Sequence, residues 1–496
     1  MADSNPSQLV GGMDRAKQTL GSRQLAALLP DLAGMRPAYR HLAQAISALI
    51  LDGRVALHVR LPAERELAVA LKTSRSTVTA VYDLLRESGY AQSRQGSGTW
   101  TALPEGRTPN GITRLLGPQE SAIDLARAAP GLPEQMLNEA LAHIAPQLAE
   151  HACTPGYHPY GLPELRAVIA ERFTRRGIMT MPEQILVTSG AQHALTLVMG
   201  LLCRPGDRVM VETPSYPTAL DAMRRARLRT VSVPVTDTGG WDIEIMESTL
   251  RQVVPQLSYL IPDFQNPTGG LMPDDDRIRV LRAAQRCDTW LVVDETMTDL
   301  ALDVPAPLPF VSHAPPNGAS KVITIGSMSK THWAGLRIGW LRAPSQLVTE
   351  LAGQRVATTM GGSVVDQLLA LALLPRAEEL MLSRLDQLRE QRAALSAALG
   401  EYLPEWTWQL PPGGLSLWVD LGEPIASPLA ERVLDYGVRI EAGDCFAADP
   451  GIFEQRLRIP YTMPPDTLRE AVHRMAAALA DGLPRSSVTR QPRWVA

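Results

Sequence analysis

Residues 321–340 read KVITIGSMSKTHWAGLRIGW, and this stretch decides the fold class. It begins with a near-continuous apolar run, KVITIGS, which is typical of a strand buried on both faces of a sheet. Helical segments separate this run from four earlier ones of the same kind, ILVTSG, RVMVETP, LSYLIPD and TWLVVDE. Buried strands that alternate with helices predict an α/β domain with a mostly parallel sheet, which we place at residues 123–483.

Lysine is scarce in this chain. Among its 48 lysines and arginines, only Lys17, Lys72, Lys321 and Lys330 are lysines. In such a composition a lysine without a specific role would be an arginine, so each lysine is a candidate for chemistry that arginine cannot perform. Lys321 begins a predicted strand and is expected to be structural. The sequence therefore directs attention to Lys330.

The segment around Lys330 resembles the Schiff-base segment of fold-type-I aminotransferases, in which Ser-x-Ser-Lys is followed by an arginine. The resemblance implies that pyridoxal phosphate (PLP) is the cofactor and that its aldehyde condenses with the amine of Lys330. It also implies that Ser327, Ser329 and Arg337 hold the cofactor phosphate.

Other parts of that family's site occur in the required order along the chain. TSGAQHAL follows a strand and opens a helix, and backbone N–H groups at such a helix start can bind a phosphate. The resemblance implies that Asp294, at the end of LVVDE, pairs with the pyridine nitrogen and keeps it protonated. The phosphate-binding candidates on the helix start are Ser189, Gly190, Ala191 and Gln192.

The same resemblance assigns four more positions. Asn266, in NPTGG, corresponds to the residue that hydrogen-bonds the phenolic oxygen of the cofactor, and Tyr216, in ETPSYP, to the aromatic residue that stacks on its ring. Arg458, in RLRIPYT, is the candidate for binding a substrate or effector carboxylate. Tyr157, in YHPYGLPELR, is expected to reach the phosphate of a neighbouring subunit.

One departure from the family pattern concerns chemistry. The family has a tyrosine two or three residues after the aspartate, whereas Thr296 and Met297 stand here. Neither residue can donate a phenol hydrogen bond, so we expect the cofactor to bind but efficient transamination to be impaired. A residual half reaction is compatible with this pattern.

A different pattern occupies residues 35–102. Apolar residues at helical spacing predict a helix from Tyr39 to about Gly53, and AERELAVAL predicts a second helix after Pro62. Ser74 is a predicted N-cap for a third helix, RSTVTAVYDLLRESG. Two short alternating stretches around Gly96-Ser97-Gly98 then predict a hairpin. Three helices and a hairpin make a winged helix-turn-helix.

This region resembles the GntR family of winged-helix DNA-binding domains. The Leu-Pro, the arginine on the second helix, Ser-Arg-x-Thr-Val and Arg-x-Gly-Ser-Gly-Thr follow in the family order. Side chains at the start of a recognition helix reach phosphates and base edges in a major groove. The predicted DNA-binding residues are Arg65, Ser74, Arg75, Ser76, Thr77, Arg94, Gly96 and Ser97.

Charge and spacing complete the predicted organisation. Residues 1–110 carry 13 Lys+Arg against 9 Asp+Glu, although the whole chain has a net charge of -4, so nucleic-acid contact is expected at the N-terminal end. We expect an N-terminal arm at 1–34, a linker at 103–122 and a C-terminal tail at 484–496. The four scattered cysteines predict no metal site. No secretory signal or membrane span is predicted, so a cytoplasmic location is expected.

A winged helix in front of an aminotransferase-like domain resembles the MocR subfamily of GntR-family transcription regulators. The resemblance implies that the large domain is an effector sensor and dimerisation module, with two chains arranged head to tail. The implied partners are double-stranded operator DNA and a small effector, either PLP itself or an amino compound.

Two other hypotheses stay open. The chain could be an active PLP-dependent aminotransferase with an accessory DNA-binding head, which the intact SRSTV and RQGSGT motifs oppose. It could also be a DNA-binding protein whose large domain has lost the cofactor, which Lys330, Asp294 and Asn266 oppose.

Overall fold

The computed structural model describes residues 20–29, 38–51, 54–57, 59–94, 98–102, 123–236, 240–315, 318–449 and 451–483. The chain divides into two compact units, formed mainly by Met1–Pro109 and by Asn110–Ala448 with Glu454–Arg485. The predicted linker and C-terminal tail lie outside the described residues. Among the described residues, no helix combines the length and apolar character that crossing a membrane requires.

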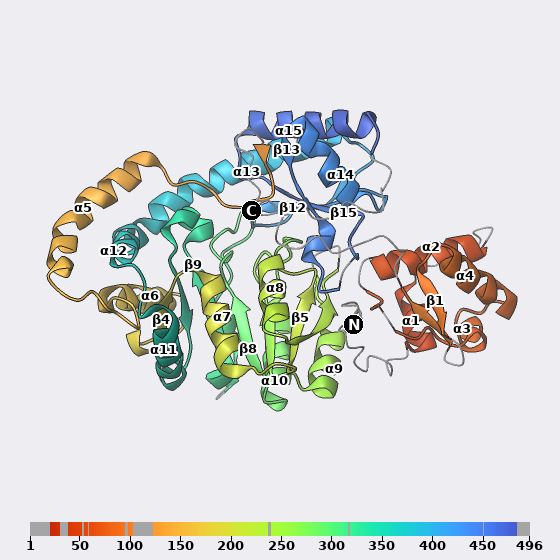
Figure 1. Cartoon of the computed structure of the whole chain (residues 1–496), viewed down its shortest axis with the longest axis horizontal. Coiled ribbons are helices and arrows are strands. Elements are labelled where there is room, and N and C mark those ends of the chain that lie inside the picture. The colour runs from red at the N-terminus through yellow and green to blue at the C-terminus, as the bar shows by residue number, and fades with distance from the viewer. Residues whose placement is uncertain are drawn as a thin grey trace, which may run out of the picture. The chain divides into compact units, whose positions relative to one another are not determined.

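The N-terminal unit contains the predicted winged helix-turn-helix (Figure 1). Its helices are α2 (Ala38–Leu51), α3 (Glu64–Ala70) and α4 (Arg75–Glu87), and the antiparallel hairpin is formed by β1 (Ala91–Arg94) and β2 (Gly98–Thr101). An additional helix, α1 (Ser22–Leu28), lies within the predicted arm and packs against α3. Its seven residues are too few to show a helical period in the sequence, and packing of the buried Leu25 stabilises it.

Buried apolar faces hold the N-terminal unit together. Val78, Val81 and Leu85 of α4 are fully buried, as the helical spacing predicts. The hydroxyl of Tyr82 donates a 2.7 Å hydrogen bond to the carbonyl of Pro62, which links α4 to the segment before α3. Arg86 Nη1 donates to Oγ1 of Thr99 at 3.1 Å and so ties the end of α4 to the hairpin.

A seven-stranded sheet forms the centre of the large unit, in the order β4-β10-β9-β8-β7-β5-β6. All neighbouring strands are parallel except β10, which runs antiparallel to both β4 and β9. The predicted mostly parallel sheet is therefore confirmed. The strands are β4 (Ile185–Thr188), β5 (Arg208–Thr213), β6 (Arg229–Pro234), β7 (Leu257–Leu260), β8 (Trp290–Asp294), β9 (Val322–Ser327) and β10 (Gly339–Arg342).

Helices cover both faces of this sheet because alternate strand residues point to opposite sides. Val209 and Val211 of β5 pack with α7 (Ala191–Leu202), α8 (Pro217–Arg225) and α11 (Ser345–Thr359). Met210, between them, packs with α9 (Ile243–Val253) and α10 (Asp274–Arg286) on the other face. On the β4 side of the sheet, α5 (Glu134–Ala152), α6 (Pro163–Arg175) and α12 (Val364–Leu373) form a further apolar cluster.

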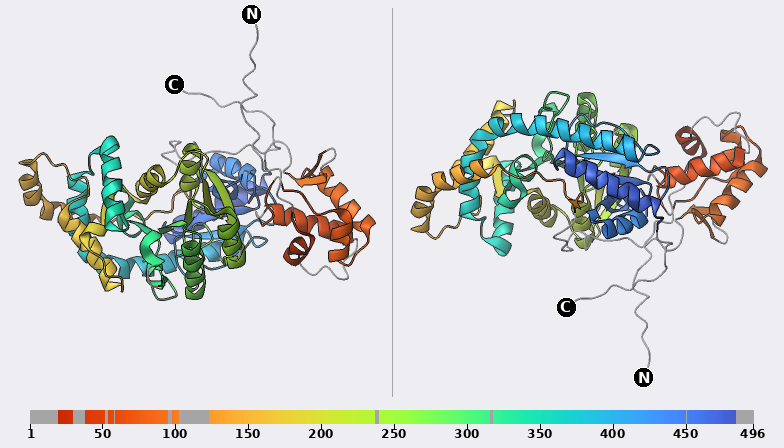
Figure 2. Two further views of the ribbon diagram at one scale, coloured as in Figure 1. Left: turned by 90° about the horizontal axis from the view of Figure 1, so that it is seen from below. Right: turned by 90° about the horizontal axis from the view of Figure 1, so that it is seen from above.

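The large unit also contains a smaller, four-stranded antiparallel sheet of order β11-β12-β15-β14. The long helix α13 (Ala377–Tyr402) runs beside α15 (Pro465–Ala480), as the views in Figure 2 show. A two-residue strand, β3 (Ile123–Asp124), pairs in parallel with β13 (Val438–Arg439). The remaining elements are β11 (Thr407–Trp408), β12 (Ser416–Asp420), β14 (Glu441–Ala442), β15 (Arg456–Pro460) and α14 (Ala426–Arg432).

Candidate functional site

A cavity of about 340 Å³ lies at the carboxyl ends of the parallel strands, which is where open α/β sheets bind ligands. Its volume is within the range of small-ligand sites. Strands β8 and β9 deliver residues from their last positions, and the start of α7 faces the same space. The predicted residues that line it are Gly190, Ala191, Gln192, Tyr216, Asn266, Asp294, Ser327, Ser329, Lys330 and Arg337.

Lys330 lies on one turn of π-helix, Ser329–Trp333, that follows β9. Its Nζ donates a 2.7 Å hydrogen bond to the carbonyl of Ala128. Burial lowers the pKa of the Lys330 amine to about 8, with the nearby positive charge of Arg458 acting in the same direction and Asp294 opposing it. A larger fraction of this amine is therefore neutral near physiological pH than for an ordinary lysine, as a nucleophile requires.

Asp294 ends β8 and is 5% exposed. Its Oδ2 accepts a 2.7 Å hydrogen bond from the hydroxyl of Tyr259, and its Oδ1 accepts one from the N–H of Thr296 at 3.0 Å. Burial raises the pKa of Asp294, whereas these donors and the charge of Lys330 lower it. The carboxylate is thus held in one orientation on the lining of the cavity.

Another part of the cavity lining suits an anion. Helix α7 begins at Ala191, so the first backbone N–H groups of the helix lie at the cavity. Arg337 donates from Nη2 to the carbonyl of Ser189 at 2.7 Å. A Cβ atom on Gly190 would lie 3.3 Å from that guanidinium, so the glycine keeps the space between helix and arginine open. Ser327 and Ser329 line the same side, and their hydroxyls are 2.9 Å apart.

A buried amide holds the loop that carries Asn266. Gln265 Nε2 donates to the carbonyl of Pro214 at 2.7 Å and to Glu212 at 3.2 Å, so the loop is joined to the segment that leads into Tyr216. Burial raises the pKa of Glu212 to about 7. One polar cluster therefore positions both Asn266 and Tyr216, which come from different strand ends.

Three predicted residues lie outside the cavity lining. Ser189 donates its N–H to Nδ1 of His193 at 3.1 Å, so this N–H is already engaged. Tyr157 is 63% exposed and does not line the cavity of its own chain. Arg458 is buried, lies 5.0 Å from the ring of Phe446, and donates to the carbonyl of Ala126.

Several cavity residues were missed by the motif analysis. Thr218, Ile261 and Ala334 line the cavity, and Tyr259 supports Asp294 from the neighbouring strand. Tyr259 occurs in the apolar run LSYLIPD, where an aromatic residue is ordinary for a buried strand, so nothing in the sequence marked it. Thr296 and Met297 also line the cavity at the positions where the family tyrosine is missing.

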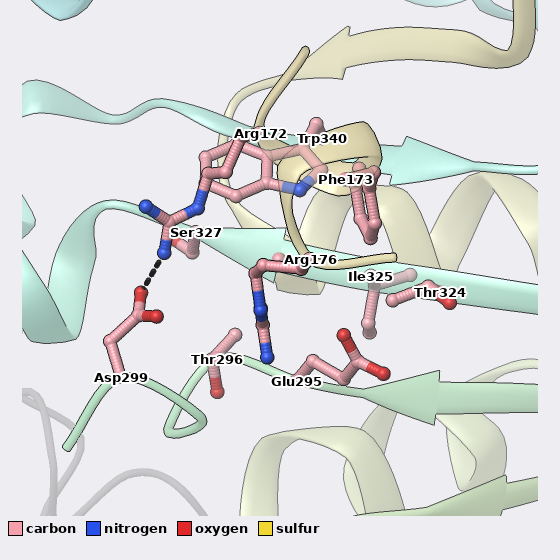
Figure 3. Close-up of a pocket in the computed structure, with 11 residues that line it drawn as sticks. Arg172, Phe173, Arg176, Glu295, Thr296, Asp299, Thr324, Ile325, Ser327 and Trp340 are labelled. Atoms are coloured by element: carbon pink, nitrogen blue, oxygen red, sulfur yellow. Dashed lines mark hydrogen bonds and ion pairs between the residues drawn. The ribbon is translucent and has the colours of Figure 1, made fainter. Parts of the chain in front are cut away.

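A second cavity, shown in Figure 3, shares Thr296 and Ser327 with the first. Arg172 forms an ion pair with Asp299 at its edge, and burial together with the charge of Asp263 raises the pKa of Glu295 to about 7. Its volume of about 20 Å³ has room for about one water molecule and not for a cofactor.

The start of α4 confirms the predicted cap. The Ser74 hydroxyl accepts a 3.1 Å hydrogen bond from the N–H of Thr77 and lies 2.8 Å from the Ser76 hydroxyl. Arg75 is exposed, with its Nε 3.3 Å from the carboxylate of Glu64. Arg65 is exposed on α3. Arg94 is the last residue of β1, and Gly96 and Ser97 lie outside the described residues.

Two family models match separate parts of the chain. Residues 123–475 match the model of aminotransferase class I and II, and residues 38–100 match that of bacterial regulatory proteins, gntR family. The first match covers more than half of the chain.

The chain is similar to proteins named as transcriptional regulators and to a solved aminotransferase structure. The chain is 29% identical over 411 residues to the uncharacterized HTH-type transcriptional regulator YisV of Bacillus subtilis, covering 77% of this chain and 84% of YisV. It is 34% identical over 334 residues to the probable rhizopine catabolism regulatory protein MocR of Rhizobium meliloti, covering 63% and 66%. The crystal structure of LysN, an alpha-aminoadipate aminotransferase from Thermus thermophilus complexed with N-(5'-phosphopyridoxyl)-L-leucine, superimposes with a TM-score of 0.69 at 30% identity, covering 76% of this chain and 96% of LysN.

Proposed function

Because the chain belongs to the aminotransferase class I and II family and carries a gntR-family winged helix in front of that domain, we propose that it is a PLP-binding transcription regulator. The winged helix binds operator DNA, and the large domain senses a small effector. MocR of Rhizobium meliloti is named a probable regulatory protein and YisV an HTH-type transcriptional regulator, and both names support the proposal.

The lining of the described cavity fits PLP. The amine of Lys330 and the carboxylate of Asp294 are both on its lining, and the start of α7 with Arg337 provides an anion site for a phosphate. When bound, PLP supplies an aldehyde that reacts with amines and a ring that withdraws electrons. Lys330 would hold the aldehyde carbon, Asp294 would keep a proton on the ring nitrogen, and Tyr216 and Asn266 would contact the ring.

The observation that carries the regulatory role is a pair of main-chain contacts. Lys330 and Arg458 donate to the carbonyls of Ala128 and Ala126, two residues apart in one extended segment. This segment directly follows β3, and residues 103–122 join β3 to the winged helix in the sequence. A ligand whose carbonyl or carboxylate groups accept hydrogen bonds from Lys330 and Arg458 replaces the backbone carbonyls as acceptors. The carbonyls of Ala128 and Ala126 then lose these hydrogen bonds. Occupancy of the cavity is thereby linked to a segment that residues 103–122 join to the winged helix in the sequence.

Regulation requires only a modest free-energy difference between ligand states. A tenfold change in operator affinity corresponds to about 1.4 kcal/mol of coupling. The effector is an amino compound with a carboxylate, or PLP itself, since the cavity offers the amine-reactive Lys330 site for the former and the anion site for the latter. Two chains associate head to tail in the cytoplasm, and the exposed Tyr157 of each reaches the phosphate site of the other.

The alternative function is that of a working aminotransferase, as LysN is named. Two measurements on the full-length protein separate the functions. Operator duplexes selected from a random pool should bind with different affinity in the presence and absence of PLP, and half-transamination with common amino acids should be slow. Rapid multiple-turnover transamination together with operator binding that is indifferent to PLP and amines would contradict the regulatory role.

A further inference from the structure

Glu64 is the first residue of α3, and its carboxylate contacts the recognition helix α4 at two positions. Its Oε2 accepts a 3.3 Å hydrogen bond from Nε of Arg75 and a 2.9 Å hydrogen bond from Oγ1 of Thr79. The hydroxyl of Thr79 also lies 3.0 Å from the carbonyl oxygen of Arg75. One carboxylate oxygen therefore restrains two side chains on the first turns of α4.

The contact leaves the end of the Arg75 side chain available. The side chain of Arg75 is 73% exposed, that of Glu64 only 26%. Glu64 engages Nε, and within the described part of the chain no residue accepts a hydrogen bond from the two terminal nitrogens. Those nitrogens form a planar pair of donors, and such a pair matches the O6 and N7 acceptors of guanine in a major groove.

Glu64 also places a negative charge beside the predicted DNA-binding face. This charge repels DNA phosphates, which an unrestrained arginine would contact without regard to sequence. A carboxylate at this place thus lowers the affinity for any DNA while it holds Arg75 in the orientation suited to a base. Discrimination that combines an attractive contact with a repulsive one is a general route to specificity.

We propose that Glu64 is a positioning residue for sequence readout: it orients Arg75 toward a guanine and keeps the guanidinium away from phosphates. The inference rests on the DNA-binding part of the proposed function.

Other contacts hold α4 in place without Glu64. Tyr82 bonds to the carbonyl of Pro62, and Val78, Val81 and Leu85 are fully buried. Replacing Glu64 should therefore change the orientation of Arg75 more than that of the helix. Glu66 offers a matched control because it lies in the same first turn of α3 and is exposed. Any effect of charge on the helix or on DNA in general is shared by the two glutamates.

The experiment selects duplexes from a random pool with the full-length protein and with four variants, Glu64→Ala, Glu66→Ala, Arg75→Ala and the double variant that combines Glu64→Ala with Arg75→Ala. The unsubstituted protein should favour guanine at one position of each half-site by about tenfold. Glu64→Ala should lose this preference at the same position as Arg75→Ala, and the double variant should lose no more. Affinity of Glu64→Ala for random DNA should rise, with a steeper salt dependence equivalent to about one more phosphate contact. Glu66→Ala should raise the affinity for all sequences alike.

Retention of the guanine preference by Glu64→Ala at the position that Arg75→Ala relaxes would overturn the inference. So would an equal loss of affinity for all sequences with a lowered melting temperature, because that result indicates a structural role. If Glu64→Ala does not fold, Glu64→Gln tests the same point, since it keeps the acceptor and removes the charge: random-DNA affinity must rise. Failure of the unsubstituted protein to select any sequence would instead contradict the proposed DNA binding.

Discussion

The hydroxyl of Tyr259 donates a 2.7 Å hydrogen bond to Oδ2 of Asp294, and neither side chain is more than 5% exposed. Tyr259 is the last but one residue of β7, and Asp294 ends the neighbouring parallel strand β8. A phenol is therefore present beside the aspartate, although the family tyrosine that follows the aspartate in sequence is absent. The phenol supports the carboxylate and does not occupy the position of the missing tyrosine, which Thr296 and Met297 fill.

Tyr259→Phe should weaken PLP binding, and more so at low pH. The phenol lowers the pKa of Asp294, so its removal raises this pKa further above the ordinary value and the carboxylate is lost at a higher pH as the solution is acidified. A lost hydrogen bond of about 1 kcal/mol corresponds to roughly a fivefold weaker affinity. Equilibrium titration with PLP at several pH values measures the effect. The control is Tyr461→Phe, which removes another buried phenol, 3.2 Å from the carbonyl of Gly413, and should leave PLP affinity unchanged.

Lys330→Ala should abolish covalent attachment of PLP. The Lys330 amine lines the cavity, whereas Lys321 is paired with Asp288 at 2.6 Å and lies 5.6 Å from the ring of Trp290. Borohydride reduction followed by peptide mass spectrometry should find the cofactor on the peptide that contains Lys330, and Lys321→Ala should still carry it. Attachment that persists in Lys330→Ala and disappears in Lys321→Ala would show that the assignment is wrong.

PLP uptake should accelerate as pH rises, with a midpoint near pH 8. The pKa of Lys330 is lowered to about 8, so the amine becomes neutral and nucleophilic at a lower pH than an ordinary lysine. Arg458→Gln should move the midpoint to higher pH, because the positive charge of Arg458 lowers the pKa of Lys330. Stopped-flow absorbance of apoprotein mixed with PLP follows the reaction. Arg474→Gln, which removes a half-buried arginine paired with Glu470, should leave the midpoint where it is.

DNA binding should depend on the two arginines exposed on α3 and α4. Arg65→Ala should weaken binding to all sequences and reduce the salt dependence by about one phosphate contact. Arg75→Ala should weaken the free energy of operator binding by roughly 1–3 kcal/mol and relax the sequence preference at one base position. Fluorescence anisotropy over a range of salt concentrations measures both. Arg224→Ala on α8, where the arginine pairs with Asp221, is the charge-matched control. Unchanged operator affinity in both Arg65→Ala and Arg75→Ala would exclude the proposed binding mode.

Gly339→Ala should destabilise the large unit. A Cβ at this position would lie 2.6 Å from the backbone of Gly190, so β10 and the loop before α7 would have to separate. Overpacking of this kind costs roughly 1–3 kcal/mol, and PLP affinity should fall as well because Gly190 borders the phosphate site. Urea denaturation monitored by tryptophan fluorescence reports the stability. Gly353→Ala, in the middle of α11 with nothing within 4 Å of the new Cβ, should leave stability equal or higher.

Sequence reasoning located side chains of the cofactor cavity because they occur in motifs that resemble the aminotransferase site, several of them at a strand end or a helix start. Ten predicted residues line the cavity, and Ser74 caps α4 as its hydroxyl and position predict. The apolar runs also led to the correct sheet type, since apolar and polar residues do not alternate along a strand that is buried on both faces. The antiparallel strand β10 could not be told from its parallel neighbours, because a buried run of four residues has the same composition in either direction.

Local patterns in the sequence by itself determined the two-part architecture and the helix that begins at Arg75, because capping and periodicity act over short distances along the chain, and the resemblance of its flanking motif singled out Lys330 as the candidate lysine. Tertiary structure alone decided what those groups contact. Lys330 and Ala128 are 202 residues apart, and Arg458 and Ala126 are 332 apart. The acceptors are main-chain carbonyls. Every residue has one, so these two contacts could not be predicted from residue types. Tyr259 meets Asp294, and Glu64 meets Arg75, only because strand register and helix packing bring separate segments together.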